Sequence, residues 1–195
     1  MKVVIIKYNA GNVQSVLYAL ERLGIHASLS DAPEVIHSAD KVIFPGVGEA
    51  GTAMHYLRER KLDQVLVSLT QPVLGVCLGM QLMCTHSEEK DTPCLGIFDH
   101  KVRLFPQKSE KVPHMGWNTL ITSDHALWQG LEPDPHVYFV HSYYVDQGPY
   151  TIAETDYILP YSAALHRDNY YATQFHPEKS GTVGARILEN FLKLT

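Results

Sequence analysis

Short hydrophobic runs alternate with helix-like patterns through the first half of the chain. Val73–Val76 is apolar at every position, which is typical of a strand buried on both faces. Strands are predicted at Val3–Lys7, Ala27–Ser30, Lys41–Phe44 and Val73–Val76. Helices are predicted between Asn12 and Gly24, around Thr52–Arg60, and over Leu62–Leu69 and Leu78–Thr85. This order predicts a parallel sheet with right-handed crossovers and helices on both faces.

The second half has a different pattern, with shorter alternating runs that are rich in Tyr, Thr and Val. Strands are predicted at Lys101–Phe105, Val137–Val140, Tyr143–Val145, Thr151–Thr155, Ala163–His166 and Tyr170–Phe175. A hairpin turn is predicted at Arg167–Asn169, and an amphipathic helix follows Ser180. The predicted fold is therefore α/β and doubly wound, with a mainly parallel central sheet and an antiparallel, strand-rich C-terminal half.

Length, charge and cysteine content exclude several classes of protein. The 195 residues fit one domain, and the formal net charge is −5. No cluster of Lys and Arg could neutralise phosphates, which argues against nucleic-acid binding. No apolar stretch reaches the roughly 18–20 residues that cross a bilayer, so we expect no membrane association and a cytoplasmic location. Three cysteines without a C-x-x-C pair indicate neither a disulfide framework nor a zinc site.

The strongest chemical motif is the turn Gly75–Gly79, which has the form G-x-C-x-G between a predicted strand and a predicted helix. This context is typical of a nucleophile elbow, in which a tight turn exposes the central side chain. Cys77 is then a candidate thiolate nucleophile, and the N–H of Leu78 would face a developing oxyanion. The alternative is a buried structural cysteine, which is the preferred interpretation for Cys84 and Cys94.

A candidate acid–base pair lies near the end of the predicted strand at Tyr170–Phe175. His176 and Glu178 are two positions apart, so in an extended backbone they project to the same side. A carboxylate beside an imidazole fixes its tautomer and stabilises the imidazolium. The alternative is a turn in which Glu178 only accepts a surface hydrogen bond.

A third motif, the glycine-containing turn Pro45–Gly48, follows the predicted strand at Lys41–Phe44. In a parallel sheet it lies at the carboxyl edge, where active sites form. Its two glycines permit a backbone that turns an N–H towards a neighbouring site. A plain strand-to-helix turn remains the alternative.

These three motifs, Pro45–Gly48, Gly75–Gln81 and Phe175–Ser180, occur in this order in a known family. The chain resembles the class I, or triad, glutamine amidotransferases over essentially its whole length, so residues 1–195 are expected to form a single domain of this type. The resemblance implies hydrolysis of L-glutamine to glutamate and ammonia, with no cofactor and no metal. It implies that Cys77 is the nucleophile, His176 the acid–base group and Glu178 its orienting partner.

The same resemblance implies two sets of binding residues. The oxyanion is expected to be held by backbone groups of Val47, Gly48 and Leu78. Glutamine is expected to be bound by Gly46, Gln81, Ser142 and Tyr143.

Two further segments, Pro113–Asn118 and Tyr138–Tyr143, resemble the glutaminase subunits of imidazole glycerol phosphate synthase, in histidine biosynthesis. This resemblance implies a heterodimer with a (β/α)₈-barrel cyclase subunit that receives the ammonia. The cyclase would make imidazole glycerol phosphate and aminoimidazole-carboxamide ribonucleotide. The expected interface residues are Asn12, Met115, Trp117 and Lys179.

Other functions stay open at this point. Within the family, the ammonia could serve the anthranilate, aminodeoxychorismate or pyridoxal phosphate pathway, although Pro113–Asn118 argues against these. A cysteine peptidase or hydrolase of the same topology is a second class, in one superfamily of which a His follows the nucleophile directly; here Leu78 follows it. A binding module without turnover is a third class, which the presence of Cys77, His176 and Glu178 disfavours.

Overall fold

The computed structural model of the chain describes residues 1–9, 13–107 and 110–194. Its centre is an eight-stranded sheet with the order β2-β1-β3-β4-β14-β13-β12-β9. Five strands from β2 to β14 are parallel, and the other three run antiparallel to their neighbours. The strands are β1 (Val3–Ile6), β2 (Ser28–Ser30), β3 (Lys41–Phe44), β4 (Val73–Val76), β9 (Ile121–Thr122), β12 (Thr151–Tyr157), β13 (Leu159–Arg167) and β14 (Tyr170–Thr173).

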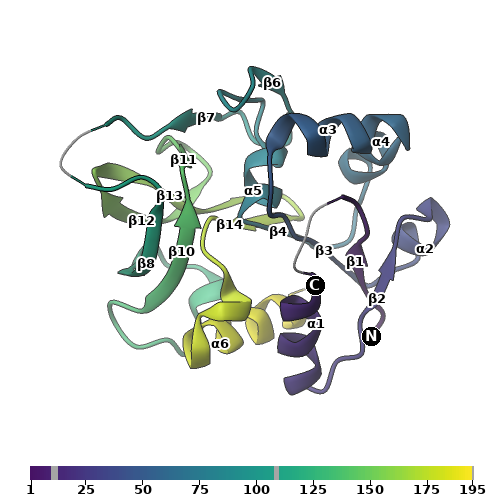
Figure 1. Ribbon diagram of the computed structural model, residues 1–195. Helices are drawn as coiled ribbons and strands as arrows, with labels where there is room; N and C mark the ends of the chain where they lie inside the picture. Colours follow the sequence, from purple (N-terminus) through teal and green to yellow (C-terminus); the bar gives the residue numbers. More distant parts are fainter. Residues whose placement is uncertain (10–12, 108–109, 195) are drawn as a thin grey trace.

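Helices cover both faces of the parallel part of this sheet (Figure 1). Alternate residues of β1 face opposite ways: Val4 and Ile6 pack with α2 to α5, whereas Val3 and Ile5 pack with α1 and α6. The doubly wound prediction is therefore confirmed. The helices are α1 (Val13–Arg22), α2 (Pro33–His37), α3 (Ala50–Glu59), α4 (Leu62–Val67), α5 (Leu78–Met83) and α6 (Gly181–Lys193).

Two smaller sheets and two 3₁₀ helices complete the fold. β8 (His114–Thr119) pairs with β10 (His136–His141) as an antiparallel ribbon. The other small sheet has the order β11-β7-β5-β6. Its strands are β5 (His86–Ser87), β6 (Thr92–Pro93), β7 (Lys101–Leu104) and β11 (Tyr143–Val145), and the 3₁₀ helices are η1 (Ala126–Trp128) and η2 (Pro177–Lys179).

The hydrophobic pattern missed several of these elements. Among them, α2 has only five residues. In β8, apolar and polar residues do not alternate with burial, because Gly116 lies in the strand and the exposed residues Met115 and Trp117 are apolar. β5, β6 and β9 are only two residues long, which is below the length at which a period can be read.

The pairing of β4 with β14 brings the candidate motifs together. These strands are parallel neighbours, and Val76 lies beside Thr173 at their carboxyl ends. The N–H of Cys77 continues the ladder by donating to the carbonyl of Thr173 at 2.7 Å. Because β3 is the other neighbour of β4, all three candidate motifs leave the same edge of the sheet. No helix in the described ranges is long and apolar enough to cross a membrane.

Candidate active site

Cys77 occupies a strained turn between β4 and α5. Its φ of 54° and ψ of −108° lie in a region that non-glycine residues rarely adopt, and such strain is found at functional turns. Gly79 lets this turn approach the end of β3, since a Cβ there would lie 2.0 Å from the carbonyl oxygen of Phe44. The turn therefore has the tight form that the G-x-C-x-G motif predicts.

His176 and Glu178 are joined by a hydrogen bond of 2.8 Å between Nδ1 and Oε1. Their side chains are only 2% and 4% exposed. The local backbone differs from the prediction, because residues 177–179 form the 3₁₀ helix η2 and not an extended segment. Pro177 fits the first turn of this helix and brings Glu178 back onto the imidazole. The main-chain N–H of His176 donates to the carbonyl of Tyr138 on β10 at 2.9 Å, which fixes the turn against that strand.

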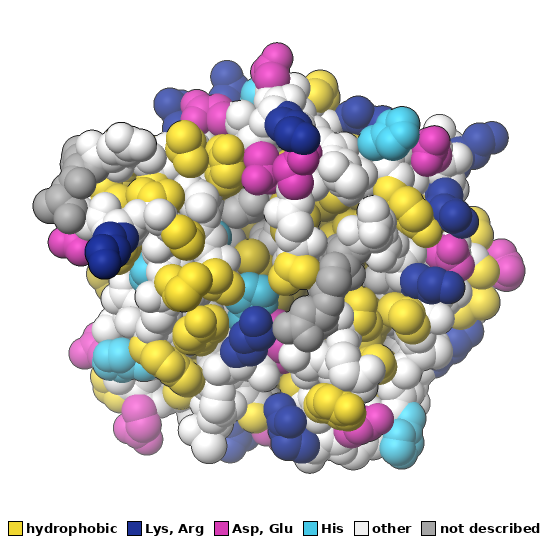
Figure 2. Space-filling model, viewed as in Figure 1, with side chains coloured by type: hydrophobic (Ala, Val, Ile, Leu, Met, Phe, Trp, Pro, Cys, Tyr) yellow, Lys and Arg dark blue, Asp and Glu magenta, His cyan; other side chains and the backbone are white. Residues whose placement is uncertain are grey.

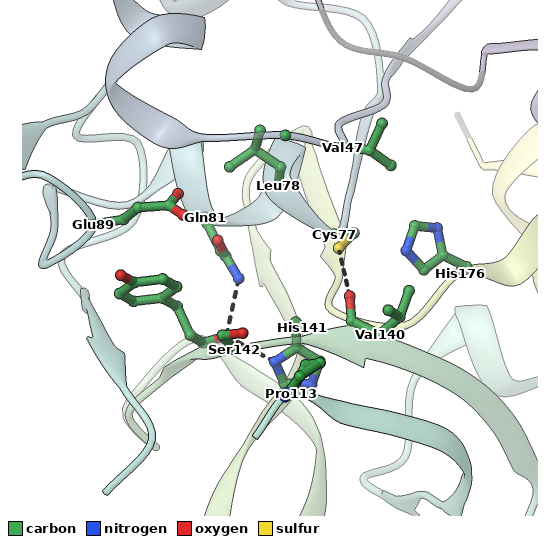
Figure 3. A pocket seen from close by; sticks show the side chains of 12 residues that line it. Val47, Cys77, Leu78, Gln81, Glu89, Pro113, Val140, His141, Ser142 and His176 are labelled. Atoms are coloured by element: carbon green, nitrogen blue, oxygen red, sulfur yellow. Dashed lines mark hydrogen bonds between the residues drawn. The ribbon is translucent and has the colours of Figure 1, made fainter. Parts of the chain in front are cut away.

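The electrostatics of this pair favour a charged imidazole. Burial disfavours the imidazolium, but the Cys77 sulfur and the Glu178 carboxylate outweigh it and raise the pKa of His176 to about 10. His176 Nε2 has no hydrogen-bond partner within the described residues, so it is available for proton transfer. The Cys77 sulfur and the His176 ring face one another across one cavity (Figure 3). The arrangement places a charged imidazole beside the sulfur of the candidate nucleophile.

The cavity has a volume of about 330 Å³ and contains most of the predicted site. It is large enough for an amino-acid side chain and its α-carbon groups, and it opens between the ends of β4, β10 and β11. Its lining residues are Val47, Gly48, Cys77, Leu78, Gln81, Glu89, Pro113, Val140, His141, Ser142, Tyr143 and His176.

One of the predicted oxyanion donors, Leu78, is already bonded in this conformation. The N–H of Leu78 donates to the carbonyl of Gly46 at 3.3 Å, so that carbonyl occupies the side of the turn on which an oxyanion would bind. Gly48 has φ of 118° and would carry a Cβ into open space, so backbone conformation and not packing reserves this position for glycine.

The predicted glutamine-binding residues lie along one wall. Gln81 projects from α5, and its Nε2 donates to the carbonyl of Tyr143 and to Oε1 of Gln174, at 3.0 Å each. Ser142 connects β10 to β11, and its carbonyl accepts the N–H of Phe105 at 3.1 Å. Gly46 is buried behind the turn of Cys77 and does not line the cavity, unlike the other three residues.

Comparison with known proteins decides the family. The family Glutamine amidotransferase class-I matches residues 4–194. This chain is a class-I glutamine amidotransferase.

Two curated relatives show to which group within the family the chain is similar. Imidazole glycerol phosphate synthase subunit HisH of Bacteroides thetaiotaomicron is 60% identical and covers 100% of both chains. The HisH subunit of Vibrio cholerae is 47% identical over 98% of each chain. The chain therefore belongs with the HisH subunits.

Solved structures support the fold. A glutamine amidotransferase crystal structure has a TM-score of 0.75 at 22% identity and covers 97% of each chain. The PurLQS structure from Thermotoga maritima has a TM-score of 0.73 at 14% identity and covers 98% of this chain and 97% of its own. At these identities the likeness concerns the fold alone.

Two of the predicted interface residues of this amidotransferase, Met115 and Trp117, are exposed. Met115 and Trp117 point outward from β8 and are 63% and 56% exposed, so neither is a core residue. Trp117 packs edge-on against Tyr138, and the Nζ of Lys179 lies 6.0 Å from the centre of the Tyr138 ring. Figure 2 shows hydrophobic side chains gathered over β8 and β10, beside a histidine and a basic residue. Asn12 lies outside the described residues.

Five residues at the candidate site carried no functional prediction. Glu89, Pro113, Val140 and His141 line the cavity, and Gln174 lies behind Cys77. Three of them, Pro113, Val140 and His141, belong to the two segments that resemble the glutaminase subunits. Their place in those segments could have marked them as candidate site residues. Glu89 came from a loop without a motif; burial raises the pKa of its carboxyl, which accepts the N–H of Ala50 at 2.7 Å.

Proposed function

We propose that the chain is the glutaminase subunit of an imidazole glycerol phosphate synthase and that it hydrolyses L-glutamine to glutamate and ammonia. The observation that carries the proposal is the buried pairing of His176 with Glu178 beside Cys77, at one cavity of about 330 Å³. The 60% identity to a HisH subunit supports the assignment to histidine biosynthesis.

The proposed reaction proceeds through a thioester. The Cys77 sulfur attacks the side-chain carbonyl carbon of glutamine, and the C–N bond breaks as His176 gives a proton to the departing ammonia. His176 then removes a proton from water, which attacks the thioester carbonyl. Glutamate leaves, and the proton returns to the sulfur. Glu178 stabilises the imidazolium throughout, and backbone N–H groups at Val47, Gly48 and Leu78 bind the oxyanion.

The closed oxyanion site gives this proposal a direct test. Because the Leu78 N–H is bonded to Gly46, we expect the isolated chain to be nearly inactive until the partner subunit and its ligand rearrange this peptide. Loss of one oxyanion donor costs about 10²–10³ in rate, so adding the partner is expected to raise glutaminase activity at least about 100-fold. Glutamate release by the isolated chain at the rate of the complex would contradict the proposed activation.

The proposed partner is a (β/α)₈-barrel cyclase that forms a heterodimer with this chain and uses its ammonia to make imidazole glycerol phosphate and aminoimidazole-carboxamide ribonucleotide. We propose that Met115, Trp117, Lys179 and Asn12 contact it. Exposed Met and Trp side chains support this, because both residues are enriched at interface cores.

Trp117→Ala is expected to weaken this complex. Loss of a central aromatic contact typically costs 2 kcal/mol or more, which corresponds to roughly a 30-fold rise in Kd. Titration calorimetry with the purified barrel subunit measures the change. Val67→Ala is the control, since Val67 is 48% exposed on α4, at the other side of Figure 1. Equal binding by the Trp117 variant and the wild type would place the interface elsewhere.

Two further expectations belong to the same proposal. We propose that residues 1–195 act as a single glutamine amidotransferase domain, which the family match over residues 4–194 supports. We also propose a cytoplasmic location. All three cysteines are free, and a reducing compartment keeps a thiol nucleophile active.

A further inference from the structure

Gln174 is a buried carboxamide that the proposed mechanism does not use. It lies between the end of β14 and His176 and is completely inaccessible to solvent. Its main-chain N–H donates to the carbonyl of Ala163 on β13 at 2.8 Å. A buried side-chain amide is costly unless its polar atoms are bonded, so its partners indicate what it does.

The orientation of the Gln174 amide follows from its neighbours. The carbonyl oxygen of Tyr143 can only accept, so the end of Gln81 that lies 3.0 Å from it must be the NH₂ group. That same NH₂ group lies 3.0 Å from the Gln174 amide, which must therefore present its oxygen to Gln81. The other end of the Gln174 amide is then the NH₂ group, and it faces Cys77.

The Cys77 sulfur has opposing polar neighbours. Gln174 Nε2 lies 3.7 Å from Sγ and offers an N–H, which favours negative charge on the sulfur. The carbonyl oxygen of Val140 lies 3.8 Å from Sγ and disfavours that charge. Among the described residues, His176, Tyr8 and Tyr161 are titratable side chains that interact electrostatically with the sulfur. Both tyrosines are deeply buried and stay neutral across the ordinary pH range.

We propose that Gln174 is a further catalytic residue: its amide N–H donates to the Cys77 sulfur and stabilises the thiolate, and Gln81 holds the amide in that orientation. The proposal rests on the proposed glutaminase function. In this proposal Gln174 supplies an uncharged hydrogen-bond donor to the Cys77 sulfur. Through Gln81, the same amide is also connected to the Tyr143 carbonyl on the wall where glutamine is expected to bind.

The test compares two variants of Gln174 in the full chain. Gln174→Met keeps the length of the side chain and removes both hydrogen bonds. Gln174→Glu keeps an acceptor for Gln81 but replaces the N–H that faces the sulfur with a second oxygen. Gln71→Met is the matched control, because the Gln71 amide is likewise bonded at both ends: it donates to the carbonyl of Ile36 at 2.9 Å and accepts the N–H of Thr70 at 3.2 Å, far from the site.

The measurement is the pH dependence of Cys77 alkylation by iodoacetamide, followed by the mass of the labelled peptide. Loss of one charge-assisted hydrogen bond is expected to raise the midpoint by about one pH unit in Gln174→Met, and to slow alkylation about tenfold at pH values well below the wild-type midpoint. A larger rise is expected in Gln174→Glu, in which a carboxylate faces the thiolate. The Gln71 variant is expected to keep the wild-type midpoint.

Two outcomes would overturn the proposal. An unchanged midpoint in Gln174→Met, together with a raised KM for glutamine, would show that Gln174 only positions Gln81. Should Gln174→Met fail to unfold cooperatively, the Glu variant decides, and an unchanged midpoint there also contradicts the proposal. Alkylation requires no glutamine, so this result is separate from failure of the proposed function, which would appear as no glutamate release by the wild-type complex.

Discussion

Cys77→Ala is expected to abolish glutamine-dependent synthesis by the complex and to leave ammonia-dependent synthesis intact. The substitution removes one sulfur atom from a turn whose shape is set by Gly79 and by the pairing of β4 with β14. Loss of a nucleophile costs at least about 10⁴-fold in turnover, because the remaining groups act only through it. The step that consumes ammonia belongs to the proposed partner, so added ammonium salt should restore product formation.

Cys94→Ala is the matched control for this experiment. Cys94 is half-buried, its thiol contacts the carbonyl of Thr92 at 3.4 Å, and burial raises its pKa to about 12. We expect this variant to keep glutamine-dependent activity. Parallel loss of the glutamine-dependent and ammonia-dependent reactions in Cys77→Ala would show that Cys77 supports the structure and is not the nucleophile.

The elements that the sequence predicts well are those whose residues are buried on both faces or alternate over several turns. Val73–Val76 forms β4 with the predicted bounds, and the predicted C-terminal helix packs through Ile187, Leu188 and Phe191. The position of each such element is determined by which side chains are buried, and buried side chains produce a regular spacing of apolar residues in the sequence. The strained turn at Cys77 was also predictable, because only small residues fit at the positions two before and two after the central residue of such a turn, and here these are Gly75 and Gly79.

What the sequence could not predict depends on contacts between distant segments. Glu178 reaches His176 through a 3₁₀ turn that is anchored on β10, and no local pattern distinguishes this turn from an extended segment. The hydrogen bond from the Leu78 N–H to the Gly46 carbonyl requires one particular orientation of the peptide at Pro45–Gly48. The glycines of that turn permit more than one orientation, so the sequence does not determine which is adopted. Gln174 had no motif of its own, and its contact with Cys77 exists only because β14 pairs with β4.

Glu178→Gln is expected to lower the rate of glutamine hydrolysis by up to about 10⁴-fold, the loss seen when the orienting carboxylate of a catalytic triad becomes an amide. The amide oxygen can still accept from Nδ1 of His176, so the side chain keeps its size and place but loses its charge. Glu178 lies behind His176 and does not line the cavity, so we expect kcat to fall and KM to stay near its wild-type value.

The pH profile of Glu178→Gln distinguishes loss of charge from loss of structure. With Glu178 present, the imidazolium persists until the pH rises through the His176 pKa of about 10, and activity is expected to fall there as the proton donor is lost. Without the carboxylate this pKa falls, so the alkaline limb should move to lower pH. Glu189→Gln makes the same chemical change on the surface of α6, where Glu189 pairs with Arg186 and Lys193, and should leave both the rate and the profile unchanged. A Glu178 variant whose alkaline limb coincides with that of the wild type would show that the carboxylate does not stabilise the imidazolium during turnover.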